Sequence, residues 1–488
     1  MNTLLTGLKE NTNYTLTENG GLTHESTNSN LLDMFALGGS YRNRTDDDCI
    51  TLFKLALDDS FTYALKCLFY LRDIRGGQGE RRFFRVCMNW LAGIHPEAAG
   101  RVMKYIPEYG RWDDLYCLMG TCLEVEALDL IKAQLHKDVY SKTPSLLAKW
   151  LPSENASSKK TKALAIKTRK HLGFTAKQYR KTLSILRERI NVLERLMSSN
   201  EWDKIDFAGI PSKAGLNYKY VFMKRDETSE RYARFMESKN TKVNADVLNP
   251  VDIVHKILYA PIGTDDRNHS DRLAFQKYWD NLKDYYNGRE ERGIAVVDVS
   301  GSMYGTPLEA AISMGAYIAE RGKGPFKDHF ITFSKSPKLV RFEGVDIYDK
   351  IHRCKDADWG FNTNIEATMN LILQTALETG CPQDEMPETL YIFSDMQFDR
   401  AFSDVRGNGM TTFFEYEKKI FESYGYKMPR VIFWNLDARG QNTIPAIGEG
   451  FSYISGFSMV MLEQILSGLD GMDILVDKLG SERYANIY

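Results

Sequence analysis

The sequence lacks the features that would place the protein in a membrane, in a secretory pathway or around a cysteine-based site. No apolar run approaches the roughly 18 residues that a membrane-spanning helix needs. The segment from Met1 to Gly20 is polar and has no apolar signal-peptide core. The seven cysteines are scattered without a CxxC pair, which argues against a zinc cluster and a disulfide framework. We therefore expect reduced thiols and a cytoplasmic protein without membrane contact.

The common arrangements of catalytic residues are also missing. The eight histidines are dispersed, and no Ser–His, Cys–His or paired-carboxylate arrangement stands out. Asp298 follows a predicted strand, as the nucleophile of a haloacid dehalogenase-type phosphatase would. That chemistry needs a second carboxylate two residues later, where this chain has Ser300. We expect the protein not to be an enzyme.

Positive charge is concentrated in one part of the chain. The protein has a net charge of −2, yet residues 141–225 contain 19 Lys and Arg against 6 Asp and Glu. The rest of the chain has 44 Lys and Arg against 59 Asp and Glu. Helices usually balance cations with acids one turn away, so this excess indicates an anionic partner. A solvated surface is the alternative.

Residues 31–290 have helical periodicity almost throughout. From Thr51 to Leu71, apolar residues recur at spacings of three and four, which predicts one core-facing helix. Short breaks rich in Gly and Pro separate such segments, as in stacked helix pairs. We predict an α-solenoid after a polar N-terminal segment at residues 1–30.

From Gly293 the pattern changes to alternating strands and helices. The run Gly293–Asp298 is short and apolar, as a buried parallel strand requires. Further strands are predicted at 329–333, 338–342, 390–393, 430–434 and 451–454, and helices at 306–321, 364–377, 413–424 and 458–469. This alternation predicts a mostly parallel, doubly wound, Rossmann-like sheet over residues 291–488. Ligands of such sheets bind at the carboxyl ends of the strands.

Oxygen-bearing side chains gather at those strand ends. Asp298, Ser300 and Ser302 alternate after the first strand, Thr363 precedes a predicted helix, and Asp395 follows the fourth strand. Two carboxylates and three hydroxyls suit a hard divalent cation, and a free coordination position then accepts a carboxylate or phosphate from a partner. We predict a Mg²⁺ site, with Mn²⁺ and Ca²⁺ as alternatives. The other interpretation is that these residues only cap loops and helices.

This set of five residues resembles the metal-ion-dependent adhesion site of von Willebrand factor A domains. All five positions match in order and in strand context, and the resemblance covers about residues 291–488. It implies that Ser300, Ser302 and Thr363 bind the metal directly. It also implies that Asp298 and Asp395 act mainly through water.

Two stretches of the helical half resemble the TROVE module of the Ro autoantigen, namely Leu71–Arg81 and Tyr109–Asp114. That module is a ring of HEAT-like helix pairs closed by a von Willebrand A domain, and it binds structured and misfolded RNA. Residues 148–152, 179–187 and 210–213 are more similar to the DUF2828 family of unknown function, which pairs the same two domains. RNA binding is therefore implied only through the more distant Ro relatives.

Both TROVE-like stretches also have a structural interpretation. The loop Arg75–Gly79 lacks the Gly-Lys-Ser/Thr ending of a nucleotide-binding loop, so we expect a helix C-cap and a turn rather than a phosphate cradle. For Arg111–Asp114 we expect a helix start capped by an aspartate, with Trp112 packed between helices.

Two predicted helices of the basic tract carry the cations that we expect to contact RNA. One begins near residue 159, and the other spans Ala176–Met197 with a separate apolar face. The predicted RNA-binding residues are Lys159, Lys160, Lys162, Lys167, Arg169, Lys170, Lys177, Arg180 and Lys181. Trp150, Phe174 and Tyr179 are the nearby rings for base stacking, with a core position as the alternative for Trp150.

These features support two functions of different classes. We expect a Ro-like ribonucleoprotein component that binds structured or misfolded RNA with single-stranded ends and has a metal-dependent ligand-binding domain. The alternative is a scaffold without RNA binding, in which the metal site binds an acidic side chain of a protein partner such as an AAA+ ATPase. Nucleic acid that co-purifies with the protein, detected by the 260/280 nm absorbance ratio, would distinguish them.

Overall fold

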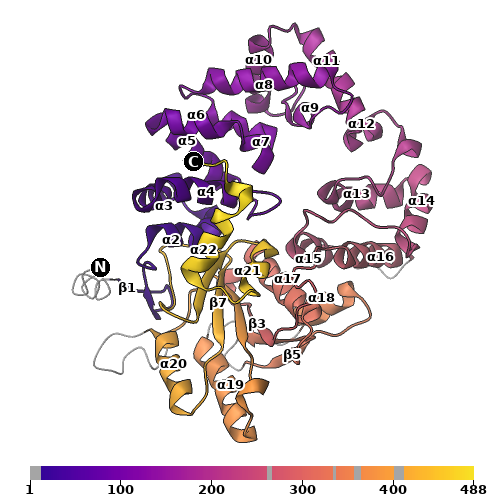
Figure 1. Ribbon diagram of the computed structural model, residues 1–488. Helices are drawn as coiled ribbons and strands as arrows, with labels where there is room; N and C mark the ends of the chain where they lie inside the picture. The colour runs from indigo at the N-terminus through magenta and orange to yellow at the C-terminus, as the bar shows by residue number, and fades with distance from the viewer. Residues whose placement is uncertain (1–12, 261–265, 334–336, 357–363, 401–411) are drawn as a thin grey trace.

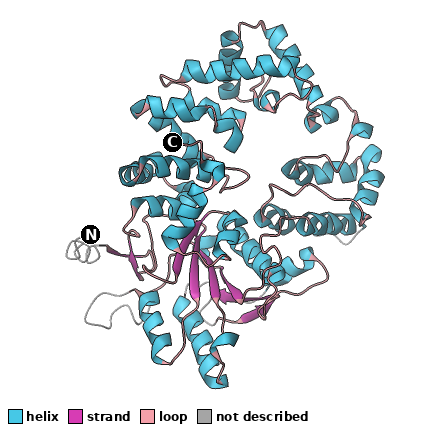
Figure 2. Cartoon of the chain, in the orientation of Figure 1, coloured by secondary structure: helices cyan, strands magenta, loops and turns pink. Residues whose placement is uncertain are grey.

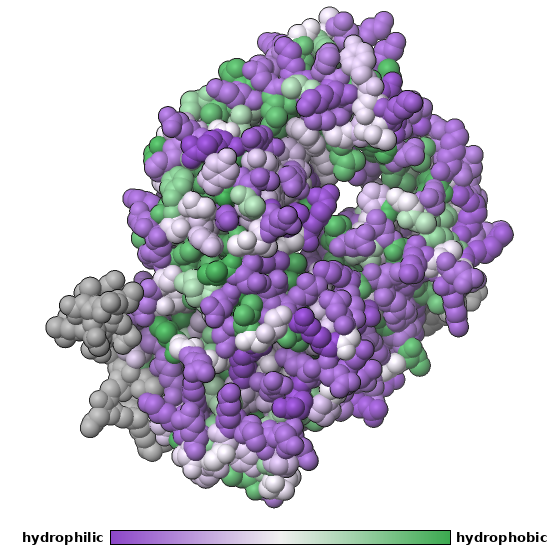
Figure 3. Space-filling view, in the orientation of Figure 1, coloured by the Kyte–Doolittle hydropathy of each residue, from purple (hydrophilic) through white to green (hydrophobic). Residues whose placement is uncertain are grey.

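The helices of the protein follow an arc that an α/β domain closes into a ring (Figure 1). This computed structural model describes residues 13–260, 266–333, 337–356, 364–400 and 412–488. The strands of the main sheet lie on one side of the ring (Figure 2), and an opening passes through the molecule between the helical arc and the sheet domain (Figure 3). Among the described helices, none is long and apolar enough to span a membrane.

The helical part begins with a small antiparallel hairpin, β1 (Tyr14–Leu16) and β2 (Leu22–His24). The helical elements that follow are α2 (Asn30–Leu37), η1 (Gly38–Asn43), α3 (Asp46–Asp59), α4 (Phe61–Arg72), α5 (Arg82–Ile94), α6 (Pro96–Met103), α7 (Ile106–Tyr109), η2 (Trp112–Leu118), α8 (Glu124–Tyr140), α9 (Leu147–Trp150), α10 (Lys159–His171), α11 (Ala176–Arg189), α12 (Leu193–Ser198), η3 (Trp202–Lys204), α13 (Ser212–Lys224), α14 (Asp226–Glu237), α15 (Pro250–Leu258) and α16 (Asp266–Asp280). Their buried apolar residues and those of the sheet domain form one continuous core.

Two helices predicted as single are each divided in the structure. The helix predicted at Thr51–Leu71 is α3 and α4, because Ser60 is extended and its side chain accepts a hydrogen bond from the backbone N–H of Tyr63. The helix predicted at Ala176–Met197 is α11 and α12, because Asn191 between them is left-handed with a φ of 48°. The apolar periodicity continues across both breaks, so it does not reveal them.

The α/β domain is built on a six-stranded sheet in the order β5-β4-β3-β6-β7-β8. Its strands are β3 (Gly293–Asp298), β4 (His329–Phe333), β5 (Leu339–Arg341), β6 (Thr389–Ser394), β7 (Arg430–Asn435) and β8 (Phe451–Ser455). Neighbouring strands are parallel, except for the edge strand β5, which is antiparallel to β4. The predicted doubly wound sheet is therefore confirmed.

Helices cover the faces of this sheet (Figure 2). The helical elements of the α/β domain are η4 (Gly301–Met303), α17 (Thr306–Arg321), α18 (Ile347–Asp356), α19 (Ile365–Thr379), η5 (Gln383–Glu385), α20 (Phe413–Ser423), η7 (Met459–Met461), α21 (Leu462–Ile465), α22 (Gly471–Gly480) and η8 (Glu482–Tyr484). In place of the helix predicted at residues 458–469 the structure has the short pair η7 and α21, which ends at Ile465. The chain turns soon after, at Gly468, which has a φ of 79°. The sequence pattern did not predict α22.

One end of the helical arc is bound to the last residues of the chain. Asp73, in the loop after α4, is fully buried. Its carboxylate accepts hydrogen bonds from Arg483 Nη2 at 2.7 Å and from the Tyr484 hydroxyl at 3.0 Å. The Tyr109 hydroxyl donates to the Arg483 carbonyl, and the rings of Tyr109 and Tyr484 stack with centroids 5.6 Å apart. We call these four residues the ring-closing interface.

The other end of the arc packs on the opposite side of the sheet domain. α15 lies against α17, where His255 Nδ1 and Glu309 Oε2 are 2.7 Å apart. α16 adds an ion pair between Arg272 and Asp346, with Nε and Oδ2 2.6 Å apart. Because both ends of the arc contact the same domain, the helical part forms a closed ring.

We expect Arg483→Ala to lower the free energy of unfolding by about 3 kcal/mol, because the buried Asp73 carboxylate loses its cation. As a control, Arg341→Ala removes an ion pair between exposed side chains, at 3.5 Å from Glu343, and should cost less than about 0.5 kcal/mol. Urea denaturation of both variants measures the difference. Equal effects, or two separate unfolding transitions in the wild type, would contradict a ring that folds as one unit.

Candidate metal site and candidate nucleic-acid surface

Two buried aspartates lie at the carboxyl ends of adjacent parallel strands. Asp298 ends β3, Asp395 directly follows β6, and both side chains are fully buried. The backbone N–H of Ser300 donates to Asp298 Oδ1 at 2.9 Å, and the hydroxyls of Ser300 and Ser302 are 3.0 Å apart. The structure thus places four of the five predicted metal-site residues at one edge of the sheet, and Thr363 lies outside the described residues.

The charge of this pair of carboxylates is poorly compensated. Burial and the neighbouring charge of Asp395 raise the pKa of Asp298 to about 7. Burial also raises the pKa of Asp395, while the nearby Ser302 hydroxyl and the Gln397 N–H act to lower it. The Asp395 Oδ2 atom is buried and has no hydrogen bond of standard geometry with the described residues. Arg439, whose charge acts in the opposite direction on Asp395, is itself paired with Asp437 at 2.6 Å. A buried carboxylate oxygen without a partner is unfavourable unless a cation binds.

The donor set at this edge is made of oxygen atoms. Within the described ranges, no three His, Cys, Asp or Glu side chains lie together as a metal site, so the two serine hydroxyls are needed to complete one. Ser300 is buried and Ser302 is half-buried. Tyr304, which follows η4 directly, is 85% exposed.

Two residues that the sequence analysis did not single out support the aspartates. The Ser394 hydroxyl donates to Asp298 Oδ2 at 2.5 Å, and the backbone N–H of Gln397 donates to Asp395 Oδ1 at 3.1 Å. Met396 between them is left-handed, with a φ of 61°, which is uncommon for a residue other than glycine. No periodicity or spacing distinguishes Ser394 or Gln397, and only their position beside Asp395 hints at a role.

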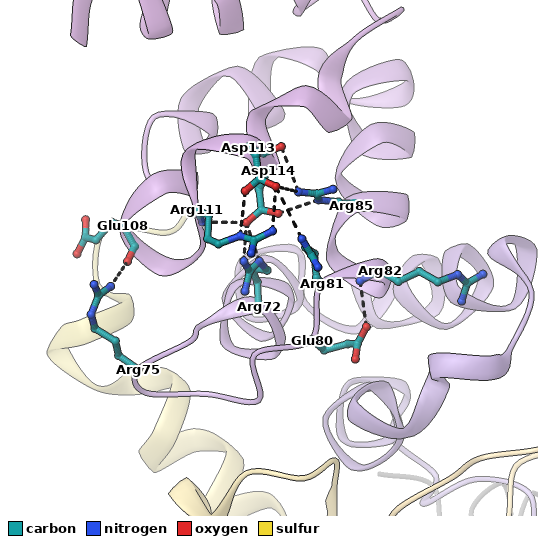
Figure 4. A network of polar contacts seen from close by, with 10 residues as sticks. All are labelled: Arg72, Arg75, Glu80, Arg81, Arg82, Arg85, Glu108, Arg111, Asp113 and Asp114. Carbon is teal, nitrogen blue, oxygen red and sulfur yellow. Dashed lines mark hydrogen bonds and ion pairs between the residues drawn. The ribbon is translucent and has the colours of Figure 1, made fainter. Parts of the chain in front are cut away.

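Four arginines, Arg72, Arg81, Arg85 and Arg111, form ion pairs with Asp113 and Asp114 in the helical arc (Figure 4). Asp114 is fully buried and accepts hydrogen bonds from Arg72 Nη2 at 2.6 Å and from Arg85 Nε at 2.7 Å. It also accepts from the backbone N–H of Arg111 at 2.8 Å and so caps η2. The expected aspartate cap is present, and its main role is to join α4, α5 and η2.

The glycine loop Arg75–Gly79 is the turn between α4 and α5. A Cβ on Gly77 would lie 1.9 Å from the Tyr70 carbonyl oxygen, so only glycine fits there. The backbone N–H groups of residues 78–80 donate to carbonyl oxygens of Tyr70, Leu71 and Asp73. These groups are therefore not available to a phosphate, in agreement with the expected turn.

The predicted RNA-binding cations lie on α10 and α11. Eight of the nine are exposed, and Arg169 is half-buried. Lys167 is paired with Glu124 at 2.6 Å and Arg169 with Glu154 at 2.7 Å, whereas Arg180 lies 3.9 Å from Glu154. The remaining six have no acidic partner within the part of the chain that the structure describes. We call them the six free lysines: Lys159, Lys160, Lys162, Lys170, Lys177 and Lys181.

The predicted stacking rings are less accessible than expected. Tyr179 is fully buried, and its hydroxyl donates to the Pro152 carbonyl at 2.9 Å. Its expected role in stacking is therefore wrong, because the apolar face of α11 packs it into the core. Trp150 is half-buried with the Arg111 guanidinium 4.0 Å above its ring, and Phe174 packs against the core.

A cavity of about 930 Å³ lies between α9, α11, α12 and α13. Cations outnumber acids along its wall, and the half-buried rings of Trp150 and Tyr218 also line it. Its charged lining residues are Lys149, Arg180, Arg187, Arg195, Lys213, Glu154 and Glu194. Arg187 holds the wall together, since its guanidinium donates to the carbonyl oxygens of Ala148 and Leu151.

Comparisons with known proteins place the chain in a family. Residues 17–143 and 145–288 match the family described as a domain of unknown function, DUF2828, and residues 292–482 match the domain of unknown function DUF7788. The chain belongs to the DUF2828 family, as its motifs predicted. An uncharacterized protein of Acanthamoeba polyphaga mimivirus is 32% identical to this chain. The alignment covers 93% of this chain and 85% of that protein. The crystal structure of the Deinococcus radiodurans Ro (RSR) protein is similar over 93% of this chain and 100% of that chain, with 13% identity and a TM-score of 0.43.

The raised pKa of Asp298 predicts a pH-dependent stability when divalent cations are removed. Between its ordinary pKa of 3.8 and about 7, the folded protein holds a proton that the unfolded chain releases, so stability falls as pH rises through this window. Asp298→Asn cannot take up that proton and should show a shallower fall. Urea denaturation in EDTA at several pH values between 5 and 8 measures both slopes. Identical slopes would show that Asp298 does not titrate in this range.

Proposed function

We propose that the protein binds RNA along α10 and α11 and that its α/β domain binds a divalent cation. The observation that carries RNA binding is the set of six free lysines, which lie exposed on two consecutive helices. A surface with this excess of unpaired cations attracts a polyanion, because phosphate contacts release the counterions that surround the nucleic acid.

The positions of three of these lysines strengthen the argument. α10 begins with Lys159 and Lys160, α11 has Lys177 in its first turn, and neither helix has an acid there. The first turn of a helix carries a partial positive charge, so a cation in it is unfavourable and an acid is favourable. A bound phosphate would turn this small local cost into a favourable contact with both the lysines and the helix N-terminus.

The neighbouring cavity extends this surface. Arg180 belongs both to the predicted RNA-binding cations and to the cavity wall. Two further cations of the wall are in ion pairs, Arg195 with Glu188 and Glu201 and Lys213 with Asp252. Trp150 and Tyr218 provide aromatic faces at the same wall. Single-stranded RNA is bound by this combination of cations and stacking platforms. We propose that the cavity takes a single-stranded segment of the RNA.

The proposed metal site is supported by the residues at the carboxyl edge of the sheet, whose side chains suit a divalent cation. Two buried carboxylates lie beside two serine hydroxyls, and Asp395 Oδ2 lacks a partner among the described residues. Oxygen donors of this kind suit Mg²⁺, with Mn²⁺ and Ca²⁺ as alternatives. Ser300 and Ser302 would contact the cation directly, and Asp298 and Asp395 would act mainly through water. The cation would supply a position for a ligand's carboxylate or phosphate.

A protein-interaction scaffold is the second candidate, and the exposure of Tyr304 favours it. A large ring that is 85% exposed beside a metal site offers contact area to a partner whose acidic side chain binds the cation. In that case the six free lysines would be a solvated face. The two experiments that follow separate this function from RNA binding.

We expect reversal of Lys159, Lys160, Lys162 and Lys170 to Glu to weaken binding of many RNA sequences alike, because phosphate contacts read no bases. Each lost contact should flatten the slope of log affinity against log salt by about 0.7 for a single strand. Salt-titrated filter binding on structured and single-stranded RNA is the measurement. The matched control reverses four exposed lysines elsewhere: Lys54, Lys239, Lys242 and Lys327. If both quadruple variants behave alike, the α10–α11 surface is not the RNA site.

Asp298→Ala should abolish the increase in Tm that Mg²⁺ gives the wild type. A ligand that binds only the folded state stabilises it by RT ln(1 + [L]/Kd), or about 2.7 kcal/mol at 100-fold Kd. Scanning fluorimetry in EDTA and in Mg²⁺ measures this shift, with the exposed Glu343→Ala as the control. A shift that persists in Asp298→Ala would place any metal elsewhere. RNA affinity should be the same in Asp298→Ala and wild type.

A further inference from the structure

The N-terminal turn (Thr17–Gly21), which joins β1 to β2, packs on the loop that follows β6. The Thr17 hydroxyl donates to the Phe398 carbonyl at 2.7 Å, and Asn19 Nδ2 donates to the Gln397 carbonyl at 2.6 Å. The backbone N–H of Glu18 donates to Gln397 Oε1 at 2.8 Å. Three hydrogen bonds therefore connect the two segments across about 380 positions of sequence.

The contact is close as well as polar. A Cβ on Gly21 would lie 2.7 Å from the Phe398 carbonyl oxygen, so glycine is needed for this approach. Gly20 and Asp399 form an antiparallel bridge beside it. The Thr17 hydroxyl also accepts from the backbone N–H of Gly21 at 2.9 Å, which keeps the turn compact. The turn is therefore shaped to fit this loop.

The loop held by the N-terminal turn is the one that carries Asp395. Gln397 accepts from the turn through both its side chain and its backbone carbonyl, and it donates its own N–H to Asp395 Oδ1 at 3.1 Å. Its side chain is 1% exposed. Gln397 thus stands between the turn and the carboxylate, with hydrogen bonds to both.

The backbone of this loop needs outside support. Met396 has a φ of 61°, a conformation that costs about 1 kcal/mol or more for a residue other than glycine. Such a conformation persists when surrounding contacts fix it. Ser394 fixes it on one side, because its hydroxyl accepts from the Met396 N–H at 3.0 Å. Gln397 and the N-terminal turn fix it on the other.

We propose that the N-terminal turn sets the cation affinity of the α/β domain by positioning Asp395 through Gln397. This inference rests on the proposed metal site. Thr17 and Gln397 are positioning residues. Neither belongs to the predicted metal-site residues, and they act on Asp395 or on its loop through hydrogen bonds. Without the turn, Asp395 samples other orientations and the site loses preorganisation.

The hairpin has separate attachments that keep it in place when these contacts are removed. His24 Nε2 lies 2.7 Å from Glu415 Oε1, and the backbones of His24 and Ile444 exchange hydrogen bonds of 3.0 and 2.9 Å. Substitutions in the turn can therefore release the loop without detaching the hairpin.

The test combines Thr17→Val with Gln397→Met, which keep similar volumes. The pair removes the hydroxyl that donates to Phe398 and accepts from Gly21, and the amide oxygen that accepts from Glu18. Isothermal titration with Mg²⁺ should show binding about tenfold or more weaker than in wild type. Thr17→Ser alone keeps the hydroxyl and should bind as wild type does. Thr15→Val is the control, because the Thr15 side chain makes no hydrogen bond with the described residues. Hydrogen exchange of residues 394–400 in EDTA reports the loop without metal, and it should be faster in the double variant only.

The outcomes are distinguishable. Wild-type Mg²⁺ affinity in the double variant, together with faster exchange of the loop, would overturn the positioning role and leave the metal site standing. Equally weak binding in Thr17→Ser or Thr15→Val would show that the hairpin acts through general stability, which also overturns it. No Mg²⁺ binding by the wild type would overturn the proposed metal site, and this inference with it.

Discussion

The closed ring depends on one buried carboxylate. Asp73 lies in the loop after α4, near the start of the chain, and its charge is balanced by Arg483 at the end. A charge removed from water must be paired, so the first helices and the last residues are held together wherever the fold exists. The Tyr484 hydroxyl and the stacked ring of Tyr109 complete the contact. One end of the helical arc is thus held at Asp73 by the last residues of the chain, and its other end is held by the packing of α15 on α17.

Ring closure also brings N-terminal residues to the edge of the sheet where the candidate metal site lies. The backbone N–H of Gly39 in η1 donates to Oγ of Ser455, the last residue of β8, at 2.9 Å. Arg42 stacks over Phe457 at 3.6 Å, and Asn43 donates to Asp437 Oδ1 at 3.2 Å. The carboxyl edge of the sheet is thus formed by the α/β domain together with residues 39–43. The α/β domain alone therefore lacks part of the edge at which the candidate metal site lies.

Much of the fold could be predicted from local pattern, and the parts that could not depend on distant contacts. The buried run Gly293–Asp298 predicts a central strand, and the alternation of Asp298, Ser300 and Ser302 predicts their convergence, because both follow from the geometry of one strand and its turn. The breaks at Ser60 and Asn191 depend on single residues that interrupt a continuous apolar period. Gln397 acquires its role only through partners about 380 positions away, which no spacing in the sequence reveals.

The two candidate sites differ in the burial of their unpaired charges, and this difference determines what each can bind. Asp298 and Asp395 are fully buried, so solvent and salt screen their charge only weakly and a cation between them would be held strongly. The six free lysines are exposed, so their charge is screened over about 8–10 Å and acts on a polyanion that spans many of them. The affinity of the buried site for a cation depends on the exact positions of its oxygen atoms, so the position of the loop that carries Asp395 matters. A surface of the second kind tolerates flexible side chains, because its affinity comes from the number of phosphate contacts and not from the exact place of any one lysine.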